Sequence, residues 1–151
     1  AFDDSAAPLD GAAAAALVAD AAARAEVVVV SIHWGGEYQA APSARQQTLA
    51  QAFAKAGATV IAGHGPHVLQ RVEWVGETLV AYSLGNLLFD QPYPADCRQG
   101  AFLRVTIEGA QIVAVDAVPT VIERGRVRRA ENEDAQAIAD RLRLEKLSYP
   151  P

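Results

Sequence analysis

Two short apolar segments separated by one helix constrain this chain more than any other feature. The first, residues 26–32, is a run of β-branched residues without polar alternation, which is typical of a strand buried on both faces. Ser43, with Gln46 three residues later, matches a capping box at a helix start, and Gly57 suits the position just after its end. A second strand is predicted at residues 59–62. Strand, helix and strand in this order form a βαβ unit, whose two strands run parallel.

The segments outside this unit predict a mixed α/β fold. An Ala-rich helix is expected at residues 8–25, because alanine has the highest helix propensity. Two β-hairpins are expected after the βαβ unit, since turn residues separate two pairs of apolar segments. Asn132 is predicted to cap a last helix that runs to about Arg143. The paired segments of the hairpins are residues 68–74 with 78–83 and residues 101–107 with 111–118.

The composition excludes several classes of protein. A chain of 151 residues suits one domain with a real core. The hydrophobic fraction of 51% and the charged fraction of 21% exclude a disordered chain, and no apolar stretch reaches the ~18 residues of a membrane span. The net charge of −5 argues against nonspecific nucleic-acid binding. Because the chain lacks Met and begins with Ala, we expect a processed product or a piece of a longer protein.

All three histidines follow the predicted parallel strands. His33 comes directly after the first strand, and His64 and His67 come after the second. The carboxyl ends of parallel strands lie on one edge of a sheet, where open α/β sheets bind their ligands. Neutral imidazole is the commonest metal ligand among side chains. We therefore expect the three imidazoles to converge in a metal or catalytic site; three unrelated surface histidines are the alternative.

Three further residues are candidates for this site. Glu37 could bind metal, act as an acid or base, or orient an imidazole, and it could also be an exposed loop carboxylate. Trp34 could wall the pocket or belong to the core. Asn86 follows a later strand and could contact a ligand or cap a turn. The single cysteine, Cys97, excludes a disulfide within the chain and is interpreted as structural.

Four segments of the sequence stand out as motifs. They are VVVVSIHWGGEY, PSARQQTLAQAFAKAGATVIAGHGPHVLQ, LVAYSLGNLLFDQ and RQGAFLRV. Together they resemble the bacterial CapA family, the poly-gamma-glutamate capsule biosynthesis proteins, from about Val27 to Gly125. That family is similar to the calcineurin-like metallophosphoesterases. The resemblance implies a four-layer α/β/β/α sandwich with a two-metal site at its strand ends.

The resemblance also implies roles for individual residues. His33 and Glu37, in HWGGE, resemble the family's single-histidine metal motif with its accompanying acid, and both are candidates for catalysis. His64 and His67, in GHGPH, resemble its terminal metal motif. The family usually has a His at the position of Gly65. The site is damaged if that His is the second ligand and intact if His67 is, which is the interpretation we favour.

The first half of the family's domain has no counterpart before Val27. Residues 1–151 therefore resemble the C-terminal part of a single domain. The missing N-terminal half is expected in the same gene product or in a companion chain, and self-association through an apolar face is the alternative. By the same resemblance, a missing N-terminal segment would make the protein extracytoplasmic or membrane-associated; a cytoplasmic location stays open.

Two functions follow from this resemblance. The first is a metal-dependent phosphoesterase-like hydrolase linked to capsule synthesis, with two divalent ions (Mn, Zn, Fe or Mg) in the complete domain. Its substrate would be a phosphorylated or anionic polymer, contacted by Asn86 and Trp34. The second is a non-catalytic binding or assembly protein for an anionic capsule polymer. A group of four arginines could contribute to it or be merely solvated: Arg124, Arg126, Arg128 and Arg129.

Overall fold

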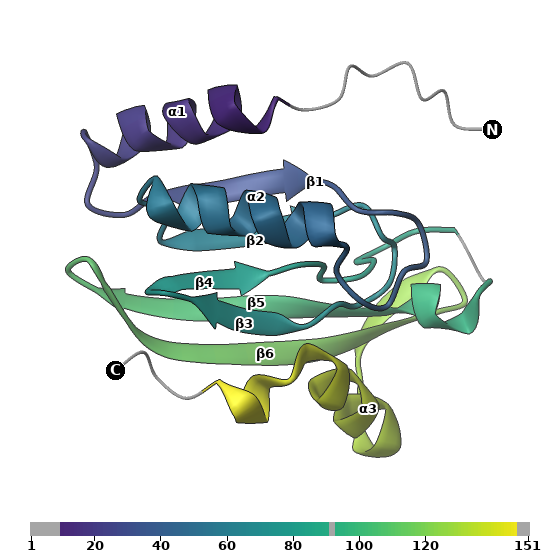
Figure 1. The fold of residues 1–151 in the computed structure, drawn as a ribbon. Helices are drawn as coiled ribbons and strands as arrows, with labels where there is room; N and C mark the ends of the chain where they lie inside the picture. The colour runs from purple at the N-terminus through teal and green to yellow at the C-terminus, as the bar shows by residue number, and fades with distance from the viewer. Residues whose placement is uncertain (1–9, 91–92, 148–151) are drawn as a thin grey trace.

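Three helices and two β-sheets make up the described part of the chain in the computed structural model, which covers residues 10–90 and 93–147 (Figure 1). Two short 3₁₀ helices, η1 and η2, connect or follow them. In chain order the elements are α1 (Gly11–Ala22), β1 (Val29–His33), α2 (Ala44–Lys55), β2 (Val60–His64), β3 (Val72–Val75), β4 (Thr78–Ala81), η1 (Ala95–Arg98), β5 (Gln99–Glu108), β6 (Gln111–Glu123), β7 (Arg126–Arg129), α3 (Asn132–Leu142) and η2 (Leu144–Lys146).

The four-stranded sheet has the order β1-β2-β4-β3 and contains the predicted βαβ unit. β1 and β2 are parallel with α2 between them in the chain, β4 is parallel to β2, and β3 is antiparallel to β4. The βαβ unit and the first hairpin are therefore confirmed. Because β1, β2 and β4 point the same way, their carboxyl ends lie on one edge of the sheet, which we call the carboxyl edge.

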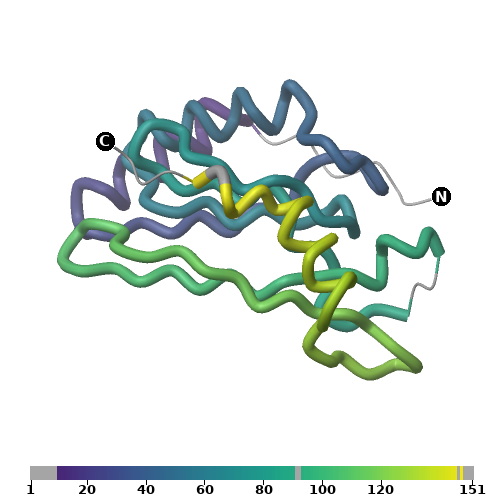
Figure 2. Tube along the Cα trace, turned by 90° about the horizontal axis from the view of Figure 1, so that it is seen from below, coloured from purple at the N-terminus to yellow at the C-terminus, as the bar shows by residue number. Residues whose placement is uncertain are grey.

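The second sheet has the order β5-β6-β7 and contains the second predicted hairpin. Figure 1 shows α1 and α2 on one side of the four-stranded sheet and the β5–β6 hairpin on the other, and Figure 2, seen from below, shows α3 in front of the sheets. Ile138 and Leu142 of α3 join the core between the two sheets. The mixed α/β prediction is confirmed, and the arrangement is that of an α/β fragment of a sandwich. No helix among the described residues has the length and apolarity that a membrane crossing needs.

The start and end of α2 follow the local sequence signals. The Ser43 hydroxyl accepts from the Gln46 backbone N–H at 3.2 Å, and the Gln46 side chain accepts from the Ser43 N–H at 2.9 Å. Gly57, with φ of +99°, lies just past the helix end. Phe53 of α2 is 1% exposed and packs in the core with Ile61 of β2. The capping box thus fixes where the helix begins, and its apolar face holds it on the sheet.

The prediction that the first strand is buried on both faces is wrong. β1 lies at the edge of its sheet, and Val29 is 61% exposed. Val30 and Ile32 point to the other face and pack against the helix-side core. The core between the sheets contains residues of β2, β3 and β4 but, among the described residues, none of β1. The apolar run therefore belongs to a strand covered on one face.

The prediction that Asn132 caps the last helix is also wrong. Glu131 occupies the N-cap position of α3 without a side-chain hydrogen bond. Asn132 is the first helical residue and has a φ of +49°. Asparagine tolerates this left-handed conformation better than most residues, so Asn132 accommodates the turn into the helix rather than capping it.

A polar cluster joins β3 to the end of β4. The Arg71 guanidinium donates to both oxygens of Glu73, at 2.7 and 3.0 Å, and lies 5.0 Å from the centre of the Tyr82 ring. The Tyr82 hydroxyl donates to Glu73 at 2.9 Å. Burial alone would raise the pKa of Glu73, but these donors and the charge of Arg71 hold that pKa below its ordinary value.

We expect Glu73→Gln to reduce the acid sensitivity of the fold. A carboxyl whose pKa is depressed by folding stabilises the native state above its unfolded pKa, near 4.5, and this contribution is lost as the pH falls through the folded pKa. Urea unfolding at several pH values should show a wild-type chain that loses stability in this window more steeply than the variant. Glu77→Gln, in the β3–β4 turn, is the control. Parallel pH profiles for wild type and Glu73→Gln would contradict the assignment.

Candidate functional site

His33 and His64 are neighbours on the carboxyl edge. Each is the last residue of its strand, and their Cα atoms are register partners in the parallel β1–β2 pair. The Trp34 backbone N–H donates to the His64 carbonyl at 2.8 Å, which continues the ladder past the strand ends. Both imidazoles are exposed. The prediction that His33 and His64 share one edge is confirmed.

Gly65 brings the loop after β2 against the loop after β1. Its φ is +122°, and a Cβ added to it would lie 2.3 Å from the Trp34 carbonyl oxygen and 3.2 Å from His33 Nε2. The Tyr38 backbone N–H donates to the Pro66 carbonyl at 2.8 Å, which ties the same two loops together further on. This close approach beside His33 is open to glycine alone, because other residues would need space that the Trp34 carbonyl occupies.

The third histidine, His67, is oriented by a chain of hydrogen bonds. The Asn86 Nδ2 group donates to the Cys97 carbonyl at 2.9 Å, which leaves Asn86 Oδ1 as an acceptor. That oxygen lies 2.9 Å from His67 Nδ1, so Nδ1 is the protonated nitrogen of the neutral ring. His67 Nε2 then carries the free lone pair, as in imidazoles whose other nitrogen is held by an oxygen and which bind metal.

The sequence did not indicate that Asn86 and Cys97 lie next to His67 and take part in its hydrogen bonding. Asn86 is 8% exposed, and both ends of its amide are engaged. Cys97 is fully buried and unpaired, which agrees with its structural interpretation. Burial raises the pKa of its thiol, and the charges of Asp96 and Glu37 raise it further. Glu37 itself is exposed in the loop after β1, which leaves the sheet at the carboxyl edge.

Trp34 fits both of its interpretations. It is buried, its indole N–H donates to the Tyr82 carbonyl at 2.9 Å, and its ring stacks on Tyr82 at 5.7 Å. It also lines a cavity of about 340 Å³ together with His33 and Gln46. Trp34 is therefore a core residue that also lines the cavity next to His33.

Aromatic rings and a buried amide pair complete the surroundings. The rings of Phe89 and Tyr38 lie 4.9 and 6.5 Å from that of His67. Gln46 Nε2 donates to Gln70 Oε1 at 2.9 Å, and Gln70 Nε2 donates to a carbonyl of the loop after β1 at 2.7 Å. Sequence reasoning missed these partners, because no periodic spacing links them to the histidines.

We expect Asn86→Leu to release the His67 ring from a single tautomer. Leucine keeps the volume but removes the acceptor for the Nδ1 proton, so both neutral tautomers become populated. Long-range ¹H–¹⁵N NMR spectra of the imidazoles report this directly. Gln136→Leu, which removes an exposed amide on α3, is the control. A His67 that stays in its Nδ1-protonated form in Asn86→Leu would show that another group orients it.

The donor chemistry of this edge fits a divalent ion in part. His33 and His64 are adjacent, and His67 presents a free Nε2, which are ligands suited to Zn, Fe, Ni or Cu. Among residues 10–90 and 93–147, however, no group of three His, Cys, Asp or Glu is placed so that it could hold a metal ion. The described residues therefore supply imidazole ligands but not a complete set.

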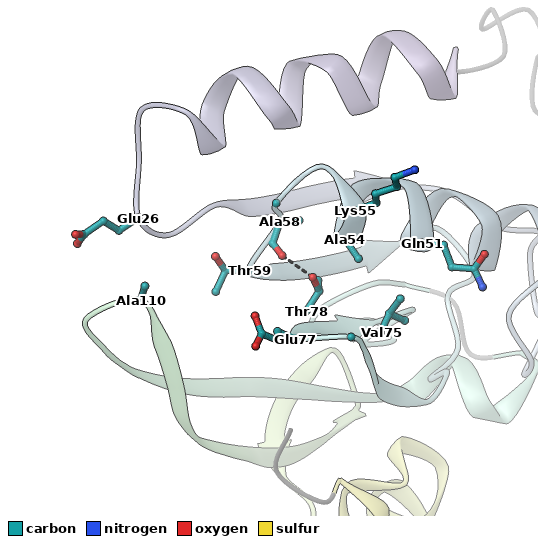
Figure 3. A pocket seen from close by; sticks show the side chains of 12 residues that line it. Glu26, Gln51, Ala54, Lys55, Ala58, Thr59, Val75, Glu77, Thr78 and Ala110 are labelled. Atoms are coloured by element: carbon teal, nitrogen blue, oxygen red, sulfur yellow. Dashed lines mark hydrogen bonds between the residues drawn. The ribbon is translucent and has the colours of Figure 1, made fainter. Parts of the chain in front are cut away.

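A second hollow lies at the opposite, amino end of the parallel strands. It has a volume of about 630 Å³ and is lined by residues that precede β2 and β4 and by the β5–β6 turn. Figure 3 shows its charged side chains, Glu26, Lys55 and Glu77, extending in different directions. Thr78 on its wall donates to the Ala58 carbonyl at 2.6 Å. Because no charged groups converge there, the candidate site is the carboxyl edge.

Comparison with known proteins places the chain in a family. The family described as Bacterial capsule synthesis protein PGA_cap matches residues 2–91. The chain is 41% identical over 101 residues to Capsule biosynthesis protein CapA of Bacillus anthracis, covering 67% of this chain and 24% of that protein. It is 48% identical over 75 residues to PGA biosynthesis protein CapA of Bacillus subtilis (strain 168), covering 50% and 20%. The chain thus spans a quarter or less of these relatives. Since the family match extends over more than half of its residues, the chain belongs to the PGA_cap family of bacterial capsule synthesis proteins.

Proposed function

We propose that this chain carries the imidazole-bearing edge of a metal-dependent, phosphoesterase-like hydrolytic site that acts in capsule polymer synthesis. The observation that supports this most is the register pairing of His33 with His64 on the carboxyl edge. The names of the relatives, which refer to capsule and PGA biosynthesis, support the role in synthesis.

We assign a different role to each residue of this edge. His33, His64 and His67 Nε2 would hold the divalent ions, which when bound supply Lewis acidity and lower the pKa of a water. Asn86 keeps His67 in the tautomer that can bind, through the bonds to His67 and to the Cys97 carbonyl. Glu37 is the candidate acid, base or orienting carboxylate, since it is exposed on the same edge.

The complete site needs ligands from outside the described residues. We propose that they come from an N-terminal half of the domain, in the same gene product or in a companion chain. The exposed Val29 and the edge position of β1 support this, because strand faces of this kind are normally covered. An N-terminal segment would also carry the proposed extracytoplasmic or membrane-associated location.

We expect the purified 151-residue chain to contain less than one equivalent of metal. It offers three imidazoles, whereas a two-metal site needs further carboxylate and amide ligands. Elemental analysis after purification without added metal measures this. The natural gene product, assayed with Mn²⁺ or Zn²⁺ on bis(p-nitrophenyl) phosphate, should hydrolyse it. Two tightly bound ions per chain would contradict the incomplete ligand set, and a metal-loaded but inactive gene product would contradict the hydrolase.

The second function is a non-catalytic protein that binds or assembles an anionic capsule polymer. The absence of a three-ligand group among residues 10–90 and 93–147 favours it. The two functions differ in the role of the histidines. Polymer binding that survives His33→Ala and His64→Ala, together with a gene product that hydrolyses no phosphoester with any added metal, would decide for the binding protein.

A further inference from the structure

We propose that Arg141 of the last helix, α3, is a positioning residue for His67 in the candidate site. Arg141 holds the 3₁₀ helix η1 through an ion pair. The Cys97 carbonyl of η1 orients the Asn86 side chain, which in turn orients the His67 ring. The inference rests on the proposed function only for its use, because that function takes His67 Nε2 as a metal ligand. The orientation itself rests on the contacts.

Arg141 of α3 and Asp96 of η1 form the first contact of this series. Nη2 of Arg141 lies 2.9 Å from a carboxylate oxygen of Asp96, and the two side chains are 34% and 44% exposed. The other terminal nitrogen of Arg141, Nη1, is buried and makes no hydrogen bond within residues 10–90 and 93–147. The Asp96 carboxylate therefore compensates the partial burial of this cation, and the pair joins η1 to α3.

α3 is fixed on the core, whereas η1 has little internal support. Ile138 and Leu142, which precede and follow Arg141 on α3, are fully buried in the core between the sheets. η1 is four residues long and has no side-chain capping bond, and the hydrogen-bond geometry of 3₁₀ helices is poorer than that of α-helices. The position of η1 therefore depends on tertiary contacts, which are the Asp96 ion pair and the buried Cys97 side chain.

The position of η1 determines the tautomer of His67 through one amide group. Asp96 and Cys97 are consecutive, so a shift of Asp96 moves the Cys97 carbonyl, which accepts from Asn86 Nδ2 at 2.9 Å. The Asn86 backbone is held separately, because its N–H donates to the Gln99 carbonyl at 3.3 Å. Once the Cys97 carbonyl moves away, the amide can turn over and donate to His67 Nδ1. The ring proton would then lie on Nε2, which would lose its free lone pair.

Long-range ¹H–¹⁵N NMR spectra of the imidazoles, recorded on the metal-free chain, test the proposal. Arg141→Met keeps an apolar stem but removes the guanidinium, so the Nε2-protonated form of His67 should become populated. Asp96→Asn should have the same effect, whereas Arg141→Lys keeps the charge and should keep the wild-type spectrum. Zn²⁺ binding should weaken by up to about tenfold in Arg141→Met, the lower end for groups that orient metal ligands. Arg104→Met is the matched control, because Arg104 pairs with Asp116 on the β5–β6 hairpin.

His33 and His64 are internal references in the same spectra, because the β1–β2 pair carries them. Their tautomers should not change in any variant, and the urea midpoint should move little, as is usual for partly exposed ion pairs. A His67 spectrum that is unchanged in Arg141→Met, or an equal change in all three imidazoles, would overturn the positioning role. A gene product without hydrolytic activity would refute the proposed function and leave the metal-free spectra as evidence for this role, so the two proposals fail separately.

Discussion

Replacing His33 and His64 together by alanine is expected to weaken the binding of added Zn²⁺ or Mn²⁺ by at least about a hundredfold, since changes to groups that merely orient metal ligands already cost 10–100-fold. The two side chains end adjacent parallel strands and are exposed, so removing them takes away the one pair of neighbouring imidazoles among the described residues. His67 would be left alone on the edge. Competition titration with a coloured chelator gives the affinities.

The control for this experiment is Glu77→Ala, because Glu77 lies in the hollow at the opposite end of the sheet. It should bind metal as the wild type does. Both histidines are at the surface, so their removal should leave the urea midpoint within the small range typical of surface substitutions. A double variant that keeps wild-type affinity for both ions would exclude the His33–His64 pair as metal ligands and would remove the main support for the hydrolase.

Replacing Gly63 by alanine is expected to lower the free energy of unfolding by roughly 3 kcal/mol or more, which is the upper range for overpacking a well-filled core. A Cβ at this position would lie 2.3 Å from Trp34 Nε1 and 2.3 Å from the Tyr82 carbonyl oxygen. These two atoms form the hydrogen bond that holds the indole in the core. The added methyl group would push these two atoms apart. The displaced Trp34 would then change the wall of the cavity that it shares with His33.

The matched control is Gly76→Ala in the β3–β4 turn. Gly76 has a φ of +61° and nothing within 4 Å of an added Cβ, so its substitution costs only the backbone strain of about 1 kcal/mol. Urea unfolding of both variants separates steric conflict from backbone strain. Equal losses in the two would show that Gly63 does not need to be a glycine for packing. The Trp34 fluorescence maximum should shift in Gly63→Ala alone.

The sequence was sufficient for the βαβ unit and for the meeting of His33 with His64. Apolar runs, a capping box and a terminal glycine are local signals, and a parallel strand pair fixes which edge the following residues occupy. The sequence could not predict that Val29 is exposed. Whether the second face of a strand is covered depends on how far another sheet extends, and this information lies in the β5–β6 hairpin, about 70 residues further along the chain.

The orientation of the His67 ring could not be predicted from the sequence either. Its partner Asn86 is 19 residues away, and the carbonyl that fixes Asn86 is a further 11 residues on. Loops without periodicity connect all three. Phe89 illustrates the same limit, because an exposed aromatic residue in a loop carries no signal of which ring it will contact. Contacts between loops depend on the tertiary fold, whereas contacts between strand ends follow from topology.

The conformation of Gly65 limits how this site can be changed by mutation. With a φ of +122° and the Trp34 carbonyl oxygen 2.3 Å from an added Cβ, the loop has no room for a histidine at this position. Substitution of Gly65 by His would therefore push the two loops apart instead of adding a ligand. An imidazole at this position would require a coordinated change in the loop after β1, because the Trp34 carbonyl that blocks it belongs to that loop.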